Sequence, residues 1–167
     1  MQMKRKVLIV MGSDSDLPLM KETGKMLDHF GVPYEIRIAS AHRSPELVDE
    51  IVSRAEKDGV AVIIAGAGAA AHLAGFIASK TTLPVIGVPI DSSPLKGLDA
   101  LYATVQMPPG VPVATMAIGK AGAKNAGIFA AQIIASGDRK VERLLKDFKR
   151  SLAAEVKRKS KVKDVSK

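Results

Sequence analysis

Short apolar runs rich in β-branched residues recur along the chain and predict β-strands. Most of these runs are continuously apolar and do not alternate with polar residues, a pattern typical of strands buried on both faces. We therefore expect a parallel sheet that is covered on both sides. The predicted strands are Val7–Met11, Tyr34–Ala39, Ala61–Ala65, Pro84–Ile90 and Val113–Ile118.

Between these runs, apolar residues recur at the spacing of three to four that is typical of amphipathic helices. Gly31 follows the first pattern and provides a natural helix end. Ser44 is suited to the N-cap of the second helix, and Pro45 to its first position. The predicted helices cover about residues 17–30, 45–58, 70–79 and 122–136.

Strands that alternate with helices predict an α/β fold, because right-handed crossover helices join neighbouring parallel strands. The expected architecture is flavodoxin-like: a three-layer, doubly wound parallel sheet of about five strands. Ligands of such sheets bind beyond the carboxyl ends of the strands. This rule selects the loops at residues 12–16, 40–44, 66–71, 91–97 and 119–125.

An extra C-terminal helix is predicted after the sheet is complete. Apolar residues from Val141 to Val156 form one stripe along it. The stripe can fold back on its own domain or pack on a neighbouring subunit, and we favour the neighbour. The sequence thus predicts one domain over residues 1–156, followed by a basic, disordered tail at residues 157–167.

Composition narrows the class of protein. The 167 residues include no cysteine, which excludes disulfide and thiolate chemistry. The apolar run near the N-terminus is shorter than a signal-peptide core. No run approaches the roughly 20 apolar residues that span a bilayer. We therefore expect a cytoplasmic protein with no membrane partner.

The net charge of +8 raises the alternative of a nucleic-acid-binding protein. Residues 139–167 contain twelve Lys or Arg and four Asp or Glu, so they account for the whole net charge. Phe148 is the only aromatic residue there that could stack on a base. A solvated helix and tail is the favoured interpretation, and no nucleic-acid partner is expected.

The first loop, Gly12-Ser13-Asp14-Ser15-Asp16, follows a strand and opens a helix. Backbone N–H groups and hydroxyls at a helix N-terminus favour an anion such as phosphate, and an Asp can accept hydrogen bonds from sugar hydroxyls. Capping of the helix by Ser15 or Asp16 is an equally good explanation. The Asp-x-Asp pair of a Mg²⁺-dependent phosphatase is a weaker alternative, since no later acidic cluster supports a metal.

The second loop, Ser40-Ala41-His42-Arg43-Ser44, places a histidine at the carboxyl end of a strand. Histidine transfers protons near neutral pH, and Arg43 offers a planar set of donors to a phosphate or carboxylate. An ordinary surface histidine beside a solvated arginine is the competing interpretation. The position on a ligand-side loop makes the two about equally favoured.

The third loop, Gly66 to Ala71, matches a loose G-x-G-x-x-A fingerprint, with Asp91 at a suitable distance. An NAD(P)-dependent oxidoreductase is therefore an alternative. The fingerprint usually follows the first strand, however, and this one follows the third. Small residues that let a ligand lie against the backbone are a simpler explanation. His72 is expected to be structural.

Six long motifs follow one another over about residues 6–136: MGSDSD, SAHRSPE, AGAGAAAHLAG, LPVIGVPI, LKGLDALYATVQMPPGVPVAT and AIGKAGAKNAGIFAAQI. In sequence and in order they resemble the motifs of the N5-carboxyaminoimidazole ribonucleotide mutase family. A related class, which carboxylates aminoimidazole ribonucleotide directly, carries a lysine in place of Arg43 and lacks a matching AGAGAAAHL stretch. Direct carboxylation is the alternative activity within the resemblance.

The resemblance implies an isomerase of de novo purine biosynthesis. Such an enzyme moves a carboxylate from an exocyclic nitrogen to a ring carbon of aminoimidazole ribonucleotide, by decarboxylation and recarboxylation. The resemblance also implies that neither a metal nor a cofactor takes part. It further implies a homo-octamer in which the last helix packs on a neighbour.

The resemblance also implies roles for particular residues. Ser13 and Asp16 would contact the ribose-phosphate, and Ser40 and Arg43 would help to hold the phosphate. His42, as the catalytic residue, would shuttle the proton. The segment Gly66–Leu73 would pack against the aminoimidazole and its carboxylate, through Ala67, Gly68 and Leu73.

Overall fold

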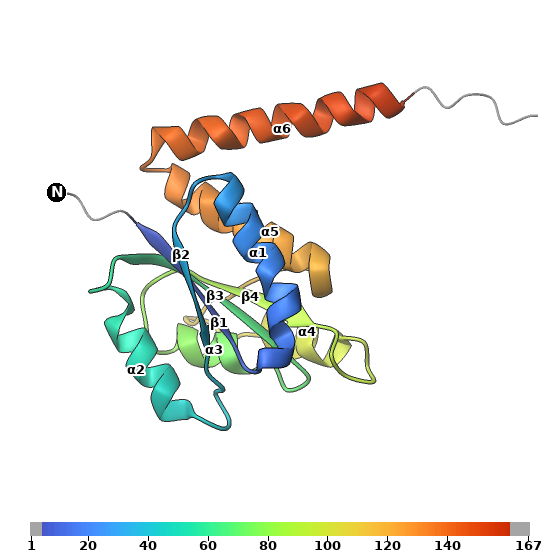
Figure 1. Ribbon diagram of the computed structural model, residues 1–167. Coiled ribbons are helices and arrows are strands. Elements are labelled where there is room, and N and C mark those ends of the chain that lie inside the picture. Colours follow the sequence, from blue (N-terminus) through green and yellow to red (C-terminus); the bar gives the residue numbers. More distant parts are fainter. Residues whose placement is uncertain (1–4, 161–167) are drawn as a thin grey trace, which may run out of the picture.

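Parallel strands form one sheet in the order β2-β1-β3-β4-β5 (Figure 1). The computed structural model describes residues 5–160. The chain starts in the middle of the sheet, adds β2 on one side and then builds outward on the other. The predicted α/β, doubly wound sheet is thus confirmed. The strands are β1 (Lys6–Met11), β2 (Tyr34–Ile38), β3 (Val60–Gly68), β4 (Val85–Ile90) and β5 (Ala114–Thr115).

Helices cover both faces of the sheet, with α1 and α5 on the opposite side from α2 and α3 (Figure 1). None of the helices described is long and apolar enough to cross a membrane. The helical elements are η1 (Asp14–Asp16, a 3₁₀ turn), α1 (Leu17–His29), α2 (Pro45–Ala55), α3 (Leu73–Ala78), α4 (Leu98–Val105), α5 (Gly119–Ala135) and α6 (Arg139–Lys159).

Alternate residues of β1 supply the two cores. Val7 and Ile9 are buried against α1 and α5, whereas Leu8 and Val10 are buried against α2 and α3. Burial of each such side chain contributes about 1.5–3 kcal/mol. The continuously apolar run therefore reflects a strand that is covered on both faces.

Helix α4 was not predicted, because its apolar residues point away from the core. Leu98, Tyr102 and Val105 are exposed, whereas Ala100 and Thr104 form the buried side. The hydroxyl of Thr104 is satisfied within the helix, since it donates to the carbonyl of Ala100 at 2.7 Å. A helix with this reversed pattern gives no inward amphipathic signal.

Other element boundaries also differ from the prediction. Strand β3 continues through Gly68, so α3 is shorter than expected, and β5 contains only two residues. Ser44 occupies the N-cap position of α2, but its hydroxyl makes no capping bond there. It accepts from the backbone N–H of Ser40 at 3.0 Å instead. Helix α5 begins at Gly119, earlier than predicted.

Helix α6 begins with a side-chain cap and packs first on its own domain. Asp138 accepts hydrogen bonds from the backbone N–H groups of Lys140 and Val141, at 2.9 and 3.1 Å. Val141 is buried, and the ring of Phe148 stands edge to face with Phe30 at a centroid distance of 5.4 Å. The expectation that the whole stripe packs on a neighbour is thus wrong for this half, because the α1–α5 face accommodates it.

The second half of α6 stands apart from the rest of the chain (Figure 1). Leu152 and Val156 are 46% and 70% exposed. For these residues, packing on a neighbour stays a prediction. The helix extends to Lys159, and residues 161–167 of the predicted tail lie outside the part described.

Replacing Phe148 by Ala should destabilise the fold by about 2–4 kcal/mol, because it removes a large side chain from the contact between α6 and the core. Lys149→Ala is the matched control, since Lys149 is exposed on the same helix. Denaturant unfolding followed by circular dichroism measures both. Equal stability of the two variants would contradict the docking of α6 seen here.

Candidate functional site

A cavity of about 300 Å³ lies beyond the carboxyl ends of β1, β2, β3 and β4. This volume is at the lower end of the range typical of ligand pockets. Gly12, Ser15, Ala41, Ala69, Ala70 and Ser92 contribute to its wall. All the predicted site residues also line it: Ser13, Asp16, Ser40, His42, Arg43, Ala67, Gly68 and Leu73.

Hydrogen bonds close the loop that carries His42 and Arg43. The backbone N–H of Ser44 donates to the carbonyl of Ser40 at 2.9 Å, and the backbone N–H of Arg43 donates to Ser40 Oγ at 3.2 Å. The Arg43 guanidinium donates to the carbonyl of Gly12 at 2.8 Å. Arg43 therefore joins two ligand-side loops, while the rest of its donor fork is available to an anion.

The capping residue of the first loop is Ser13. The sequence had suggested Ser15 or Asp16 for this role. Ser13 is the N-cap of η1, and its Oγ accepts from the backbone N–H of Ser15 at 3.3 Å. Asp16 occupies the N-cap position of α1 without a side-chain capping bond. Its carboxylate does not cap α1 and lies on the cavity wall.

Asp16 is a buried carboxyl group, only 6% exposed. Burial raises its pKa above the ordinary value, and the charge of Asp14 acts in the same direction. A backbone hydrogen bond from Ser13 and the charge of Arg43 oppose this rise in pKa only in part. A desolvated carboxylate beside a cavity is a typical functional group, because its hydrogen-bonding capacity can be completed by a ligand.

Gly66 and Gly68 leave room for neighbouring side chains of the protein itself. A Cβ on Gly66 would lie 2.5 Å from Sδ of Met20, and one on Gly68 would overlap the hydroxyl of Ser92. Asp91 lies beside Gly119 at the start of α5. These contacts explain the glycine pattern without a dinucleotide and so count against the NAD(P) alternative.

The loop after β3 is tightly turned along the cavity. Ala69 has a φ of +50°, in the left-handed region that disfavours residues with a Cβ. Two successive short turns follow, in which the N–H groups of Ala71 and His72 donate to the carbonyls of Ala69 and Ala70 at 2.9 and 2.8 Å. Backbone strain of this kind is concentrated at ligand-binding segments.

The structure also brings two residues to the site that sequence reasoning missed. Nε2 of His42 and Nδ1 of His72 lie 2.9 Å apart, although 30 positions separate them in the chain. Their rings meet edge to face at 74°. Ser92, from the loop after β4, lines the cavity directly. The carboxyl-end rule selects the loop that carries Ser92, but neither the periodicity nor a motif singles out the Ser92 or His72 side chain, since both contacts depend on how the loops meet.

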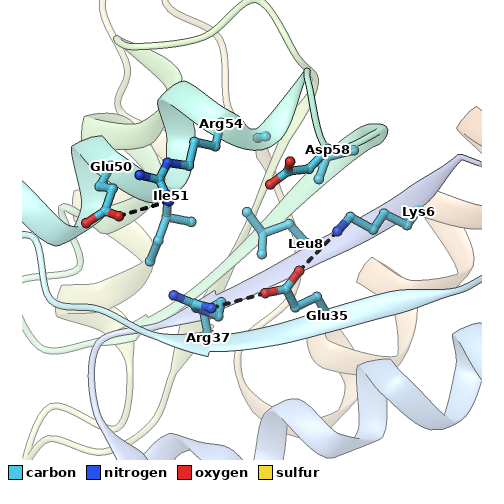
Figure 2. Close-up of a pocket in the computed structure, with 10 residues that line it drawn as sticks. Lys6, Leu8, Glu35, Arg37, Glu50, Ile51, Arg54 and Asp58 are labelled. Atoms are coloured by element: carbon cyan, nitrogen blue, oxygen red, sulfur yellow. Dashed lines mark hydrogen bonds and ion pairs between the residues drawn. The ribbon is translucent and has the colours of Figure 1, made fainter.

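A second, smaller pocket of about 100 Å³ lies between α2 and the strands β1 and β2 (Figure 2). Its charged side chains largely satisfy one another. Glu35 pairs with Lys6 at 3.1 Å and with Arg37 at 3.3 Å, while Glu50 pairs with Arg54 at 3.2 Å. Its volume is below that of a typical ligand site, so the larger cavity remains the candidate.

Comparison with known proteins identifies the family. Residues 6–155 match the family model described as AIR carboxylase. The chain belongs to the AIR carboxylase family.

Within residues 5–160, no cluster of three or more His, Cys, Asp or Glu side chains is placed to hold a metal ion.

Members of the AIR carboxylase family are closely similar to this chain in sequence and in structure. A protein from Pyrococcus horikoshii, named N5-carboxyaminoimidazole ribonucleotide mutase, is 56% identical over 154 residues, which cover 90% of this chain and 86% of that protein. A Bacillus subtilis protein of the same name is 56% identical over 82% of this chain and 85% of its own length. The crystal structure of Treponema denticola PurE superposes with a TM-score of 0.85 at 30% identity, over 96% of this chain and 99% of that one.

Proposed function

We propose that this protein is an N5-carboxyaminoimidazole ribonucleotide mutase of de novo purine biosynthesis. The observation that carries the proposal is the cavity itself. It combines His42 and Arg43 on one closed loop with a buried carboxylate, Asp16, and a wall of Ala and Gly residues. The relatives that bear this name support the assignment.

The polar end of the cavity holds the ribose-phosphate in this proposal. Ser40 and Arg43 bind the phosphate, because hydroxyl and guanidinium donors match its oxygens. Ser13 and Asp16 contact the sugar, whose hydroxyls are donors for the Asp16 carboxylate. The aminoimidazole then lies along Ala67, Gly68 and Leu73, where small residues let it approach the backbone.

The reaction is a rearrangement in which no atom is lost. The bond between the exocyclic nitrogen and the carboxylate carbon breaks, its electron pair stays on the nitrogen, and carbon dioxide is released into the cavity. The neighbouring ring carbon then uses the delocalised pair to form the new bond to carbon dioxide. His42 takes the proton from that carbon and passes it to the exocyclic nitrogen, so the number of protons is unchanged. An apolar wall favours this course, because excluding water weakens the solvation of the starting carbamate.

One assay decides between the two activities of the family. Purified protein is supplied either with N5-carboxyaminoimidazole ribonucleotide or with aminoimidazole ribonucleotide and bicarbonate. Formation of 4-carboxy-5-aminoimidazole ribonucleotide in the first mixture at a far higher rate supports the mutase. A faster reaction in the second mixture would assign the chain to direct carboxylation.

Replacing Arg43 by Lys should raise KM about 10- to 100-fold, because a lysine cannot hold both Gly12 and a phosphate with one planar fork. The turnover number should change less than KM, since Arg43 lies away from the carboxylate. Steady-state kinetics with N5-carboxyaminoimidazole ribonucleotide measure both constants. Lys80→Arg, a surface change on a residue paired with Asp49, is the control. An unchanged KM in Arg43→Lys would contradict the phosphate role.

The proposal includes a homo-octamer. Exposed apolar side chains on α4 and on the second half of α6 support an assembly, because such surfaces are usually covered. Leu98, Tyr102 and Val105 lie on the first, and Leu152 and Val156 on the second. Native mass spectrometry should give eight times the 17.6 kDa chain. A monomer at micromolar concentration would contradict it.

We place the enzyme in the cytoplasm, since its charged substrate does not diffuse across membranes. Neither a metal nor a cofactor has a step in the proposed reaction. The basic C-terminal segment has no role in it either, and removing residues 157–167 should leave mutase activity unchanged. Loss of nucleic-acid binding on this deletion would instead favour the nucleic-acid alternative.

A further inference from the structure

Ser92 lies at the opposite end of the cavity from Arg43. The strand order places the loop after β2, with Arg43, and the loop after β4, with Ser92, on either side of the loops after β1 and β3. Both residues nevertheless line the same cavity. A ligand whose phosphate lies at Arg43 therefore extends toward Ser92.

The hydroxyl of Ser92 occupies the space that a side chain at position 68 would take. A Cβ added to Gly68 would overlap this Oγ and would also lie 3.3 Å from the carbonyl oxygen of Ile90. Because residue 68 has no side chain, the Ser92 hydroxyl can reach the cavity wall. Gly68 and Ser92 thus form one matched pair.

Among the described residues, Ser92 is also the single polar side chain at this end of the cavity wall. Its neighbours there are Ala67, Gly68, Ala69 and Leu73, whereas Ser13, Ser15 and Ser40 belong to the loops after β1 and β2. One hydroxyl in an apolar wall orients a ligand more effectively than one in a polar wall, since fewer waters and side chains compete for it.

The loop after β4 is stabilised by Ser93, the neighbour of Ser92, and not by Ser92 itself. Ser93 Oγ donates to Asp99 at 2.9 Å and accepts from the backbone N–H of Leu95 at 3.2 Å. Ser92 Oγ has no such partner among residues 5–160. Ser93 therefore stabilises the start of α4, and the Ser92 hydroxyl remains available to a ligand.

From this geometry we propose that Ser92 is a substrate-positioning residue that donates a hydrogen bond to the carboxylate being transferred. The inference rests on the proposed function. A carboxylate is the favoured partner, because a hydroxyl bound to an anion forms a short, charge-assisted hydrogen bond. The phosphate, the other anionic group of the substrate, is held at the Arg43 end.

Two ribonucleotides that differ only in this carboxylate test the proposal. Ser92→Ala should weaken binding of 4-carboxy-5-aminoimidazole ribonucleotide about 10- to 100-fold and that of 5-aminoimidazole ribonucleotide much less. Ser93→Ala is the matched control: it should lower the melting temperature without changing the ratio of the two affinities. Calorimetric titration measures the affinities, and kcat and KM are measured with N5-carboxyaminoimidazole ribonucleotide.

Gly68→Ala provides a second route to the same result, because its methyl group displaces the hydroxyl without removing it. It should shift the ratio of affinities in the same direction. The double variant with Ser92→Ala should lose little more than either single variant, as expected for two residues that act as one unit.

If Ser92→Ala weakens the binding of both ribonucleotides equally, or of neither, the role of Ser92 is overturned and the proposed function is not. Wild-type protein that neither binds nor converts the carboxylated ribonucleotides would overturn the proposed function, and with it this inference. The two failures are therefore distinguishable.

Discussion

Replacing His42 by Asn should lower kcat by about 10³-fold or more, because it removes the group that takes the ring proton. Binding of 4-carboxy-5-aminoimidazole ribonucleotide should persist, since Asn keeps a polar side chain of similar reach on the same closed loop. Single-turnover kinetics and calorimetric titration measure the two effects separately. Loss of turnover with intact binding is the signature of an interaction used in the transition state.

His72→Asn is the matched control for this prediction. His72 contacts His42 at 2.9 Å, but it is not among the residues that line the cavity. Its replacement should therefore lower kcat by less than about tenfold. Unchanged turnover in His42→Asn would refute the proton-transfer role. An equally large loss in both variants would move the proton path onto the pair of histidines.

The wall of the cavity was predictable because it follows from strand order. Each strand that the apolar runs indicated ends at the same edge of a parallel sheet, so residues as distant as Ser13 and Leu73 had to meet there. The roles assigned to them came from the family resemblance and not from periodicity. His42 alone, as one histidine in one loop, had no unique interpretation.

Other features were not predictable, for physical reasons. Ser92 is one serine beside another, and only the approach of β4 to Gly68 distinguishes it from Ser93. Helix α4 turns its apolar residues outward, so a rule based on inward amphipathicity misses it. The stripe on α6 is continuous in sequence, yet half of it is covered by Phe30 and its neighbours and half is not.

Replacing Asp16 by Asn should raise the stability of the folded protein and lower kcat/KM. Burial raises the pKa of Asp16, so the folded state binds this proton more tightly than the unfolded state. The contribution of this proton to the stability of the folded state is therefore complete below the ordinary pKa of 3.8. It is lost as the pH rises through the higher pKa of the folded state. Above the pKa of the folded state the ionised carboxylate opposes folding, and a neutral Asn of the same shape does not.

Melting temperatures measured between pH 4 and 8 should therefore show Asp16→Asn above wild type at neutral pH, with a gap that narrows toward acid. In the same variant kcat/KM should fall about 10- to 100-fold, mainly through KM, because an amide oxygen accepts hydrogen bonds from ribose hydroxyls less strongly than a carboxylate. Asp58→Asn is the control, since Asp58 is exposed and does not line the cavity. It should change neither quantity much. A lower melting temperature with unchanged KM in Asp16→Asn would mean that the buried carboxylate stabilises the loop and does not bind the sugar. A higher melting temperature with a raised KM in Asp16→Asn would instead mean that burying this charge destabilises the free protein and that the bound substrate offsets this effect. This is the behaviour expected of a site built for a ligand.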